Sequence, residues 1–109
     1  MPDQQVDFES RAREAAAAMR ALFEPTPLVL KPFLSARYDA EIWLKREDLS
    51  PVRSYKIRGA FNAMRHAIAN GTDRVVCASA GNQAQVGAFA ARHFGVTAIV
   101  FMPVTSPHQ

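Results

Sequence analysis

The sequence has few of the features that tie a chain to disulfides, membranes or secretion. It holds a single cysteine, Cys77, so no disulfide can form within the chain, and its apolar neighbours indicate a small buried side chain in a reducing compartment. No stretch of about 18 apolar residues is present, and no basic segment followed by an apolar one opens the chain. We therefore expect a soluble cytoplasmic protein that does not bind membranes.

Nucleic-acid, metal and nucleotide sites also lack support. The net charge is +3, but the basic residues are scattered among carboxylates and form no nucleic-acid footprint. The three histidines, His66, His93 and His108, do not have the spacing of metal ligands. Neither a Gly-x-Gly-x-x-Gly pattern nor a Walker-type phosphate loop occurs, which argues against dinucleotide and ATP binding.

What the chain does have is ordinary globular composition, with 109 residues of which 49% are hydrophobic. Apolar periodicity predicts an N-terminal helix over residues 7–23, followed by strands that alternate with helices. The strand runs are continuous, which is typical of parallel strands covered on both faces. We therefore expect an α/β fold, a parallel β-α-β-α-β unit with right-handed crossovers after the first helix. Its strands are expected at 42–44, 75–78 and 97–102, its helices at 56–69 and 83–94, and a short extended segment at 28–30.

Lys56 lies where the helix expected over 56–69 begins, with Ser54 as the expected N-cap. A cation in the first turn opposes the helix macrodipole, so the placement costs a little stability. The dipole supplies only about 0.3–1 kcal/mol, whereas keeping a lysine amine neutral near pH 7 takes about 4.6 kcal/mol. Position alone leaves two interpretations open: an ordinary surface lysine, or a nucleophile activated by burial, by the neighbouring Arg58 or by a carbonyl cofactor.

A second candidate site is the turn Ser79-Ala80-Gly81-Asn82, which follows a predicted strand and opens a predicted helix. In open parallel sheets, ligands bind where strand ends meet helix starts. Free N–H groups, a hydroxyl and an amide would suit a carboxylate or another anion, and Gly81 would permit a left-handed or close-approach backbone. Simple N-capping by Ser79 or Asn82 explains the same residues without a ligand.

Ordered motifs carry a family resemblance. The segments Leu44-Lys45-Arg46-Glu47-Asp48-Leu49, Ser54-Tyr55-Lys56-Ile57-Arg58-Gly59-Ala60 and Ser79-Ala80-Gly81-Asn82 closely resemble the pyridoxal-phosphate enzymes of the tryptophan-synthase-β fold, or fold type II. Among these, the threonine ammonia-lyases (threonine dehydratases) are most similar. Thr26-Pro27-Leu28 and residues 101–107 fit the same family, so the resemblance runs from about residue 26 to the end.

The resemblance implies roles for particular residues. Lys56 would form the Schiff base with the aldehyde of pyridoxal 5'-phosphate and, once released by the amino-acid substrate, would take the Cα proton. Asn82 would hydrogen-bond the cofactor's ring hydroxyl, and the turn of Ser79, Ala80, Gly81 and Asn82 would hold the substrate carboxylate. The implied reaction is α,β-elimination of L-threonine or L-serine to a 2-oxo acid and ammonia, as in isoleucine biosynthesis, by a full-length enzyme expected to be a homo-oligomer.

The resemblance also bears on the extent of the chain. In the family, the glycine-rich phosphate loop and most of the second domain follow the position of residue 109, so we expect residues 1–109 to be the N-terminal portion of the catalytic domain. Apolar faces would then be exposed, and residues 1–109 alone should show little or no activity. Gln83 departs from the histidine common in this branch, and glutamine cannot titrate near neutrality.

Two alternatives stay open. The first is a sibling enzyme of the same fold, namely serine dehydratase, serine racemase or threonine synthase. The second is a non-catalytic α/β module that binds small anions at the Ser79–Asn82 turn, with Lys56 and Arg58 as supporting charges. In each case, Glu47 and Asp48 are expected to hold the loop before Lys56 instead of acting as an acid–base pair, because adjacent side chains point in different directions.

Overall fold

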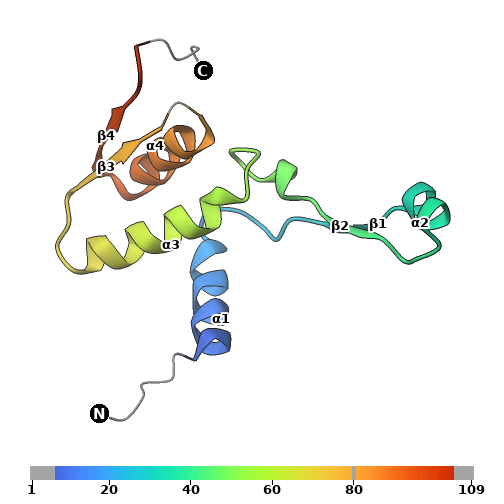
Figure 1. Cartoon of the computed structure of the whole chain (residues 1–109). Helices are drawn as coiled ribbons and strands as arrows, with labels where there is room; N and C mark the ends of the chain where they lie inside the picture. Colours follow the sequence, from blue (N-terminus) through green and yellow to red (C-terminus); the bar gives the residue numbers. More distant parts are fainter. Residues whose placement is uncertain (1–6, 80, 105–109) are drawn as a thin grey trace, which may run out of the picture.

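The computed structural model describes residues 7–79 and 81–104, which form an open arrangement of helices and short strands (Figure 1). The Cα radius of gyration is 17.4 Å, whereas a compact domain of about 100 residues has a radius of about 13 Å. Helix α3 lies at the centre, with an arm on one side and a strand–helix–strand layer on the other. The elements therefore share only part of their surfaces with one another.

The first helix, α1 (Phe8–Met19), confirms that an N-terminal helix exists, but it ends at Met19 and not at residue 23 as predicted. Its N-cap is Asp7, whose carboxylate accepts a hydrogen bond of 3.0 Å from the backbone N–H of Ser10. Pro25 and Pro27 follow soon after the helix and keep it from continuing. Met19 at its last turn is buried, so the end of α1 is the part that packs against the rest of the chain.

The arm consists of β1 (Leu28–Leu30), α2 (Pro32–Tyr38) and β2 (Trp43–Lys45). The strand expected at 42–44 exists, shifted by one residue, but it does not belong to the parallel sheet, and that part of the prediction was wrong. It pairs antiparallel with β1, so that Val29 lies opposite Leu44. The connection between the two strands, residues 31–42, contains α2 and returns the chain in the opposite direction, so β2 lies antiparallel beside β1.

Helix α2 was not predicted, and it begins with a proline, Pro32. It occupies the first turn of α2, where its fixed φ is compatible with a helix and its missing N–H has no intrahelical partner to lose. Asp39 ends the helix in the left-handed conformation at φ 49°. Proline therefore starts this helix instead of preventing it.

The core lies between α3 (Lys56–Ala69) and α4 (Asn82–Phe94), on one face of the pair β3 (Arg74–Ala78) and β4 (Thr97–Phe101). The two strands are parallel, with Val76 opposite Ile99, so the β-α-β part of the predicted unit is confirmed. Both helices were predicted within one residue of their observed bounds. The buried cluster between the helices consists of Ile57, Met64, Val86, Ala90 and Ala91.

Coverage of the parallel strands is one-sided, contrary to the expectation of two covered faces. Residues alternate between partly buried and exposed along both strands. Val76 and Phe101 are each 63% exposed on the open face, although they are apolar. The expectation that apolar faces would be exposed is thus confirmed.

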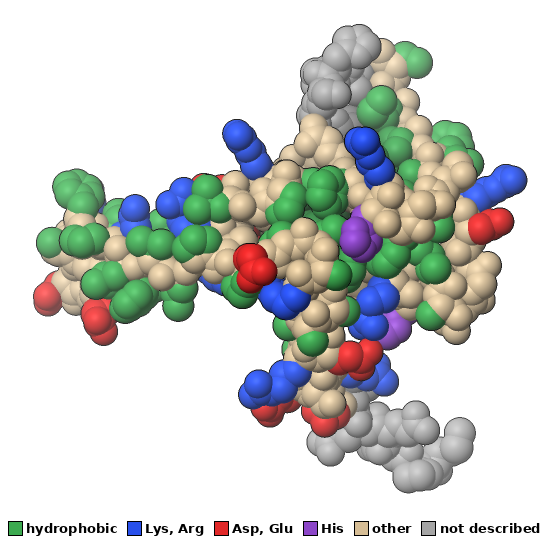
Figure 2. Space-filling model, turned by 180° about the vertical axis from the view of Figure 1, so that it is seen from behind, with side chains coloured by type: hydrophobic (Ala, Val, Ile, Leu, Met, Phe, Trp, Pro, Cys, Tyr) green, Lys and Arg blue, Asp and Glu red, His purple; other side chains and the backbone are tan. Residues whose placement is uncertain are grey.

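Exposed apolar side chains also run along the arm (Figure 2). They include Leu28, Leu30, Phe33, Tyr38, Trp43 and Leu44. Within the described ranges, no helix is both long enough and apolar enough to cross a bilayer.

Two glycines give opposite predictions for stability. Gly95 ends α4 at φ 70°, so Gly95→Ala should lower the free energy of unfolding by about 1 kcal/mol through left-handed strain. Gly59 lies inside α3, and a Cβ there would meet no atom within 4 Å, so Gly59→Ala should raise it by about 0.5–1 kcal/mol. Urea unfolding followed by circular dichroism measures both. Equal stability of Gly95→Ala and the wild type would contradict a left-handed end of α4.

Candidate active site

Lys56 is the first residue of α3, and its backbone is held by serines. The N-cap position belongs to Tyr55 and not to Ser54 as predicted, yet the Ser54 hydroxyl accepts a hydrogen bond of 3.2 Å from the Lys56 N–H. Ser54 is in turn tied to Ser50, whose hydroxyl accepts from the Ser54 N–H at 3.1 Å and donates to the Ser54 carbonyl at 3.0 Å. Both serines are buried, so the loop that delivers the chain to Lys56 is closed by hydrogen bonds.

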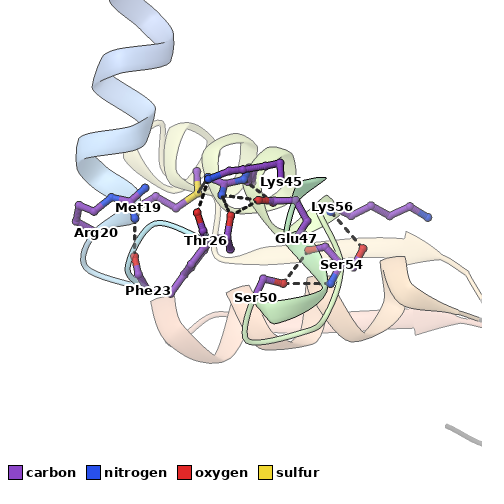
Figure 3. A network of polar contacts seen from close by, with 10 residues as sticks. Met19, Arg20, Phe23, Thr26, Lys45, Glu47, Ser50, Ser54 and Lys56 are labelled. Carbon is purple, nitrogen blue, oxygen red and sulfur yellow. Dashed lines mark hydrogen bonds and ion pairs between the residues drawn. The ribbon is translucent and has the colours of Figure 1, made fainter. Parts of the chain in front are cut away.

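The Lys56 side chain is exposed and leaves this loop in the direction away from the neighbouring polar network (Figure 3). Its ammonium forms no ion pair or hydrogen bond with any residue in the described part of the chain. It borders an open groove that α4 reaches with Gln83. The lining residues are Tyr55, Lys56, Arg58, Gly59, Ala60, Ala63 and Gln83.

The predicted anion-binding turn precedes α4 directly. The Ser79 hydroxyl accepts a hydrogen bond of 3.2 Å from the Gly81 N–H, and Asn82 begins the helix with an exposed side chain. Gly81 is the N-cap at φ −130°, so the expected left-handed backbone is wrong. A Cβ at Gly81 would meet no atom within 4 Å, so no described residue beyond its chain neighbours approaches this backbone closely. Ala80, the remaining member of the predicted turn, lies outside the described residues.

The structure brings together some of the predicted site residues and separates others. Lys56 and the start of α4 share the groove through Gln83. Ser79 borders a different depression, which Phe101 and Met102 also line. A single site made of Lys56 and the whole Ser79–Asn82 turn stays a prediction.

A polar network that the sequence analysis did not predict lies on the other side of the α3 start (Figure 3). We call Thr26, Glu47 and Arg58 the clamp. The Arg58 guanidinium donates two hydrogen bonds to the Glu47 carboxylate, of 2.6 Å from Nε and 2.9 Å from Nη2. Nη2 also donates to the Thr26 hydroxyl at 3.2 Å, and this hydroxyl donates to Glu47. Lys45 adds a hydrogen bond of 2.6 Å to the Thr26 carbonyl.

The clamp joins segments that are distant in the sequence. Glu47 opens the short 3₁₀ helix η1 (Glu47–Leu49), and Arg58 lies in the first turn of α3. On its other side, the guanidinium carbon lies 5.4 Å from the centroid of the Phe23 ring, and Nη1 lies 3.9 Å from the Met19 sulfur. Three of the family-like segments, those containing Thr26, Glu47 and Arg58, therefore meet in one place.

The contacts of the clamp shift the pKa values of Glu47 and Arg58. The hydrogen bonds from Arg58 lower the pKa of Glu47 from 4.5 to about 2, against the opposing effect of burial, and the Thr26 hydroxyl adds to the lowering. Glu47 in turn raises the pKa of Arg58. Because its charge is paired with Glu47, Arg58 is not a free cation that could activate Lys56, as the sequence had suggested.

Glu47 and Asp48 act separately, as expected of adjacent residues. The Asp48 carboxylate pairs with Arg46 at 2.8 Å, on the exposed side of η1. Glu47 ties this loop to α3, which confirms its expected structural role. The signal available in the sequence was the presence of opposite charges, Glu47 and Arg58, at the two ends of the loop.

The remaining candidates behave as packing residues. Among residues 7–79 and 81–104, no cluster of three or more potential metal ligands occurs. The His93 ring packs beside Phe61 and Phe94, with centroids 5.6 and 5.0 Å away. Cys77 is a partly buried free cysteine.

Comparison with known proteins decides the family. A sequence profile described as "Pyridoxal-phosphate dependent enzyme" matches residues 19–109. The chain belongs to this family. Pyridoxal phosphate is the cofactor of the family, as the motifs had implied, and the family's fold type II architecture agrees with the helix and the parallel strand pair seen here.

Curated relatives include two biosynthetic L-threonine dehydratases. That of Lactococcus lactis is 46% identical over 97 residues, which cover 88% of this chain and 23% of the relative. That of Bacillus subtilis is 51% identical over 85 residues, which cover 77% of this chain and 20% of the relative. The chain thus spans less than a quarter of the length of these relatives.

Solved structures of the family are also similar. A pyridoxal 5'-phosphate-dependent aspartate racemase has a TM-score of 0.86 at 27% identity, over 99% of this chain and 35% of that protein. Maize serine racemase has a TM-score of 0.81 at 28% identity, over 90% of this chain and 30% of that protein. Threonine deaminase isoform 2 of Solanum lycopersicum has a TM-score of 0.74 at 32% identity, over 98% of this chain and 31% of that protein.

The lowered pKa of Glu47 predicts how the clamp responds to acid. A carboxylate whose pKa is about 2 when folded and 4.5 otherwise contributes stability that is present above pH 4.5 and is lost as the pH falls toward 2. We expect Glu47→Gln to lower the free energy of unfolding by about 1–3 kcal/mol at pH 7. The difference from the wild type should shrink between pH 4.5 and 2 in urea titrations.

Glu9→Gln is the matched control for this experiment. Glu9 pairs with Arg13 at 2.9 Å, but both side chains are more than three-quarters exposed, so their loss should hardly change stability at any pH. A difference between wild type and Glu47→Gln that stays constant down to pH 2 would show that the charge of Glu47 is not what stabilises the clamp.

Proposed function

We propose that this chain is the lysine-bearing part of a pyridoxal-phosphate-dependent ammonia-lyase that converts L-threonine to 2-oxobutanoate and ammonia, or L-serine to the corresponding 2-oxo acid. Lys56 is the residue to which the cofactor aldehyde attaches. The observation that carries the proposal is the Lys56 ammonium, which has no partner among residues 7–79 and 81–104, at the rim of a groove bordered by α3 and α4. The threonine dehydratase names of the curated relatives support the choice of reaction.

The residues present fit part of the cofactor. The Lys56 amine can bond to an aldehyde carbon, and the exposed Asn82 amide has no hydrogen-bond partner in the described part of the chain, so it is free to bind a ring hydroxyl. Small residues, Gly59, Ala60 and Ala63, form one wall of the groove and leave room for a flat ring. Residues that hold the phosphate are expected elsewhere in the whole protein.

Bound pyridoxal phosphate supplies an electron sink for the charge that develops at the substrate Cα. The task left to the protein is to move protons and orient groups. Lys56 Nζ lines the groove and, in its amine form, would accept the Cα proton. The turn before α4 orients the substrate carboxylate with its N–H groups, and Gln83 can hydrogen-bond in the groove without exchanging protons.

Racemisation is the second candidate, because two racemases have the TM-scores of 0.86 and 0.81 given above. Both reactions start with removal of the Cα proton, so they share the role of Lys56. The product distinguishes them: a lyase releases a 2-oxo acid and ammonia, whereas a racemase releases the D-amino acid. We favour the lyase because identity is higher to the threonine dehydratases, at 46% and 51%.

The remaining features are part of the same proposal. A cytoplasmic location stays a prediction from the sequence, and a homo-oligomeric whole enzyme stays a prediction from the family resemblance. The non-catalytic anion-binding module is the outcome to expect if Lys56 does not react with the cofactor.

Labelling tests the role of Lys56. The sequence holds three lysines, Lys31, Lys45 and Lys56, so each can be followed as a separate peptide. After addition of pyridoxal phosphate and reduction with borohydride, mass spectrometry should find the pyridoxyl group mainly on Lys56, and Lys56→Arg should abolish this label. Labelling of all three lysines to the same extent would contradict the proposal. In the whole protein, release of a 2-oxo acid from L-threonine or L-serine, compared with formation of the D-enantiomer, separates lyase from racemase.

A further inference from the structure

We propose that Glu47 is a positioning residue for Lys56: through Arg58, it fixes the direction in which the first turn of α3 presents the lysine. This inference rests on the proposed attachment of the cofactor to Lys56. It concerns how the chain aims that side chain.

Helix geometry links the two residues. Successive residues of an α-helix are rotated by about 100° around its axis, so Lys56 and Arg58 project on nearly opposite sides. Arg58 reaches into the clamp, and the Lys56 side chain extends away from it (Figure 3). Fixing the Arg58 side of the first turn therefore fixes the Lys56 side as well.

The clamp is rigid enough for this task. The guanidinium is a planar fork that binds both carboxylate oxygens of Glu47, which sets its orientation as well as its distance. Only 31% of the Arg58 side chain and 19% of the Glu47 side chain are exposed, and Thr26 is buried. With the Phe23 ring on one side and the carboxylate on the other, Arg58 has little freedom to turn.

The backbone of Lys56 is held independently. Its N–H donates to the Ser54 hydroxyl, and Ser54 is tied to Ser50. These bonds fix where the helix starts but not how it is rotated about its axis. The rotation of the first turn is set by Ile57, which is fully buried in the core between α3 and α4, and by the clamp, which ties this turn to η1 and to Thr26, just before β1.

The labelling experiment above provides the readout. We compare the ratio of pyridoxyl label on Lys56 to label on Lys31 in the wild type, Glu47→Gln and Arg58→Lys, at a temperature where all have the same helical circular dichroism. Lys31 is the reference because Lys45 contacts the clamp through Thr26. In both variants the ratio should fall about tenfold, since a displacement of about 1 Å at a reacting group can cost about 10²-fold in rate.

The two variants separate position from charge. Arg58→Lys keeps the positive charge but lacks the planar fork, so it should lower the ratio as Glu47→Gln does. If only Glu47→Gln lowers the ratio, the effect is electrostatic and the positioning role is overturned. Glu9→Gln, in the exposed pair with Arg13, should leave the ratio unchanged.

The remaining outcomes distinguish this inference from the proposed function. A purely structural Glu47 would lower the melting temperature while the ratio of Lys56 to Lys31 label stays at the wild-type value, and that result overturns the positioning role alone. If the wild type shows no preference for Lys56, the proposed attachment fails and the positioning role fails with it.

Discussion

The bidentate contact between Arg58 and Glu47 is the interaction on which the rest of this structure depends. The Arg58 guanidinium at the start of α3 touches side chains from three other parts of the chain, namely Met19 of α1, Thr26 and Glu47 of η1. Arginine suits this place because it can bind a carboxylate in its plane and pack a ring against its face at the same time. A lysine here would provide the charge but could not connect the segments in this way.

An exposed ion pair would not have this effect, because solvent screens it and side-chain entropy opposes it. The Glu47–Arg58 pair differs in burial and in the number of partners that each group satisfies. The Thr26 hydroxyl accepts a further hydrogen bond from Arg58 and donates one to Glu47. The charged groups of the pair are therefore matched by polar partners. The contact between Glu47 and Arg58 also ties the loop before Lys56 to α3, the helix of which Lys56 is the first residue.

Much of the architecture could be predicted from local pattern. Helices α3 and α4 carry clear 3.6-residue periodicity, and Gly95 marks the end of α4, so both were predicted nearly to the residue. The pairing of β2 could not be predicted this way, since a three-residue apolar strand carries no information about its neighbour. The same limit applies to the site: the motif around Lys56 pointed to the lysine, but the contact between Glu47 and Arg58 depends on how a loop folds back.

The arm carries Trp43, the only tryptophan in the sequence, and half of its surface is exposed. Tryptophan emission therefore reports on this part of the molecule and on no other. Any molecule or segment that covers β1 and β2 would move the indole out of water, and the fluorescence would shift to shorter wavelength without an added dye. The chain thus carries its own optical probe among the exposed apolar side chains of the arm.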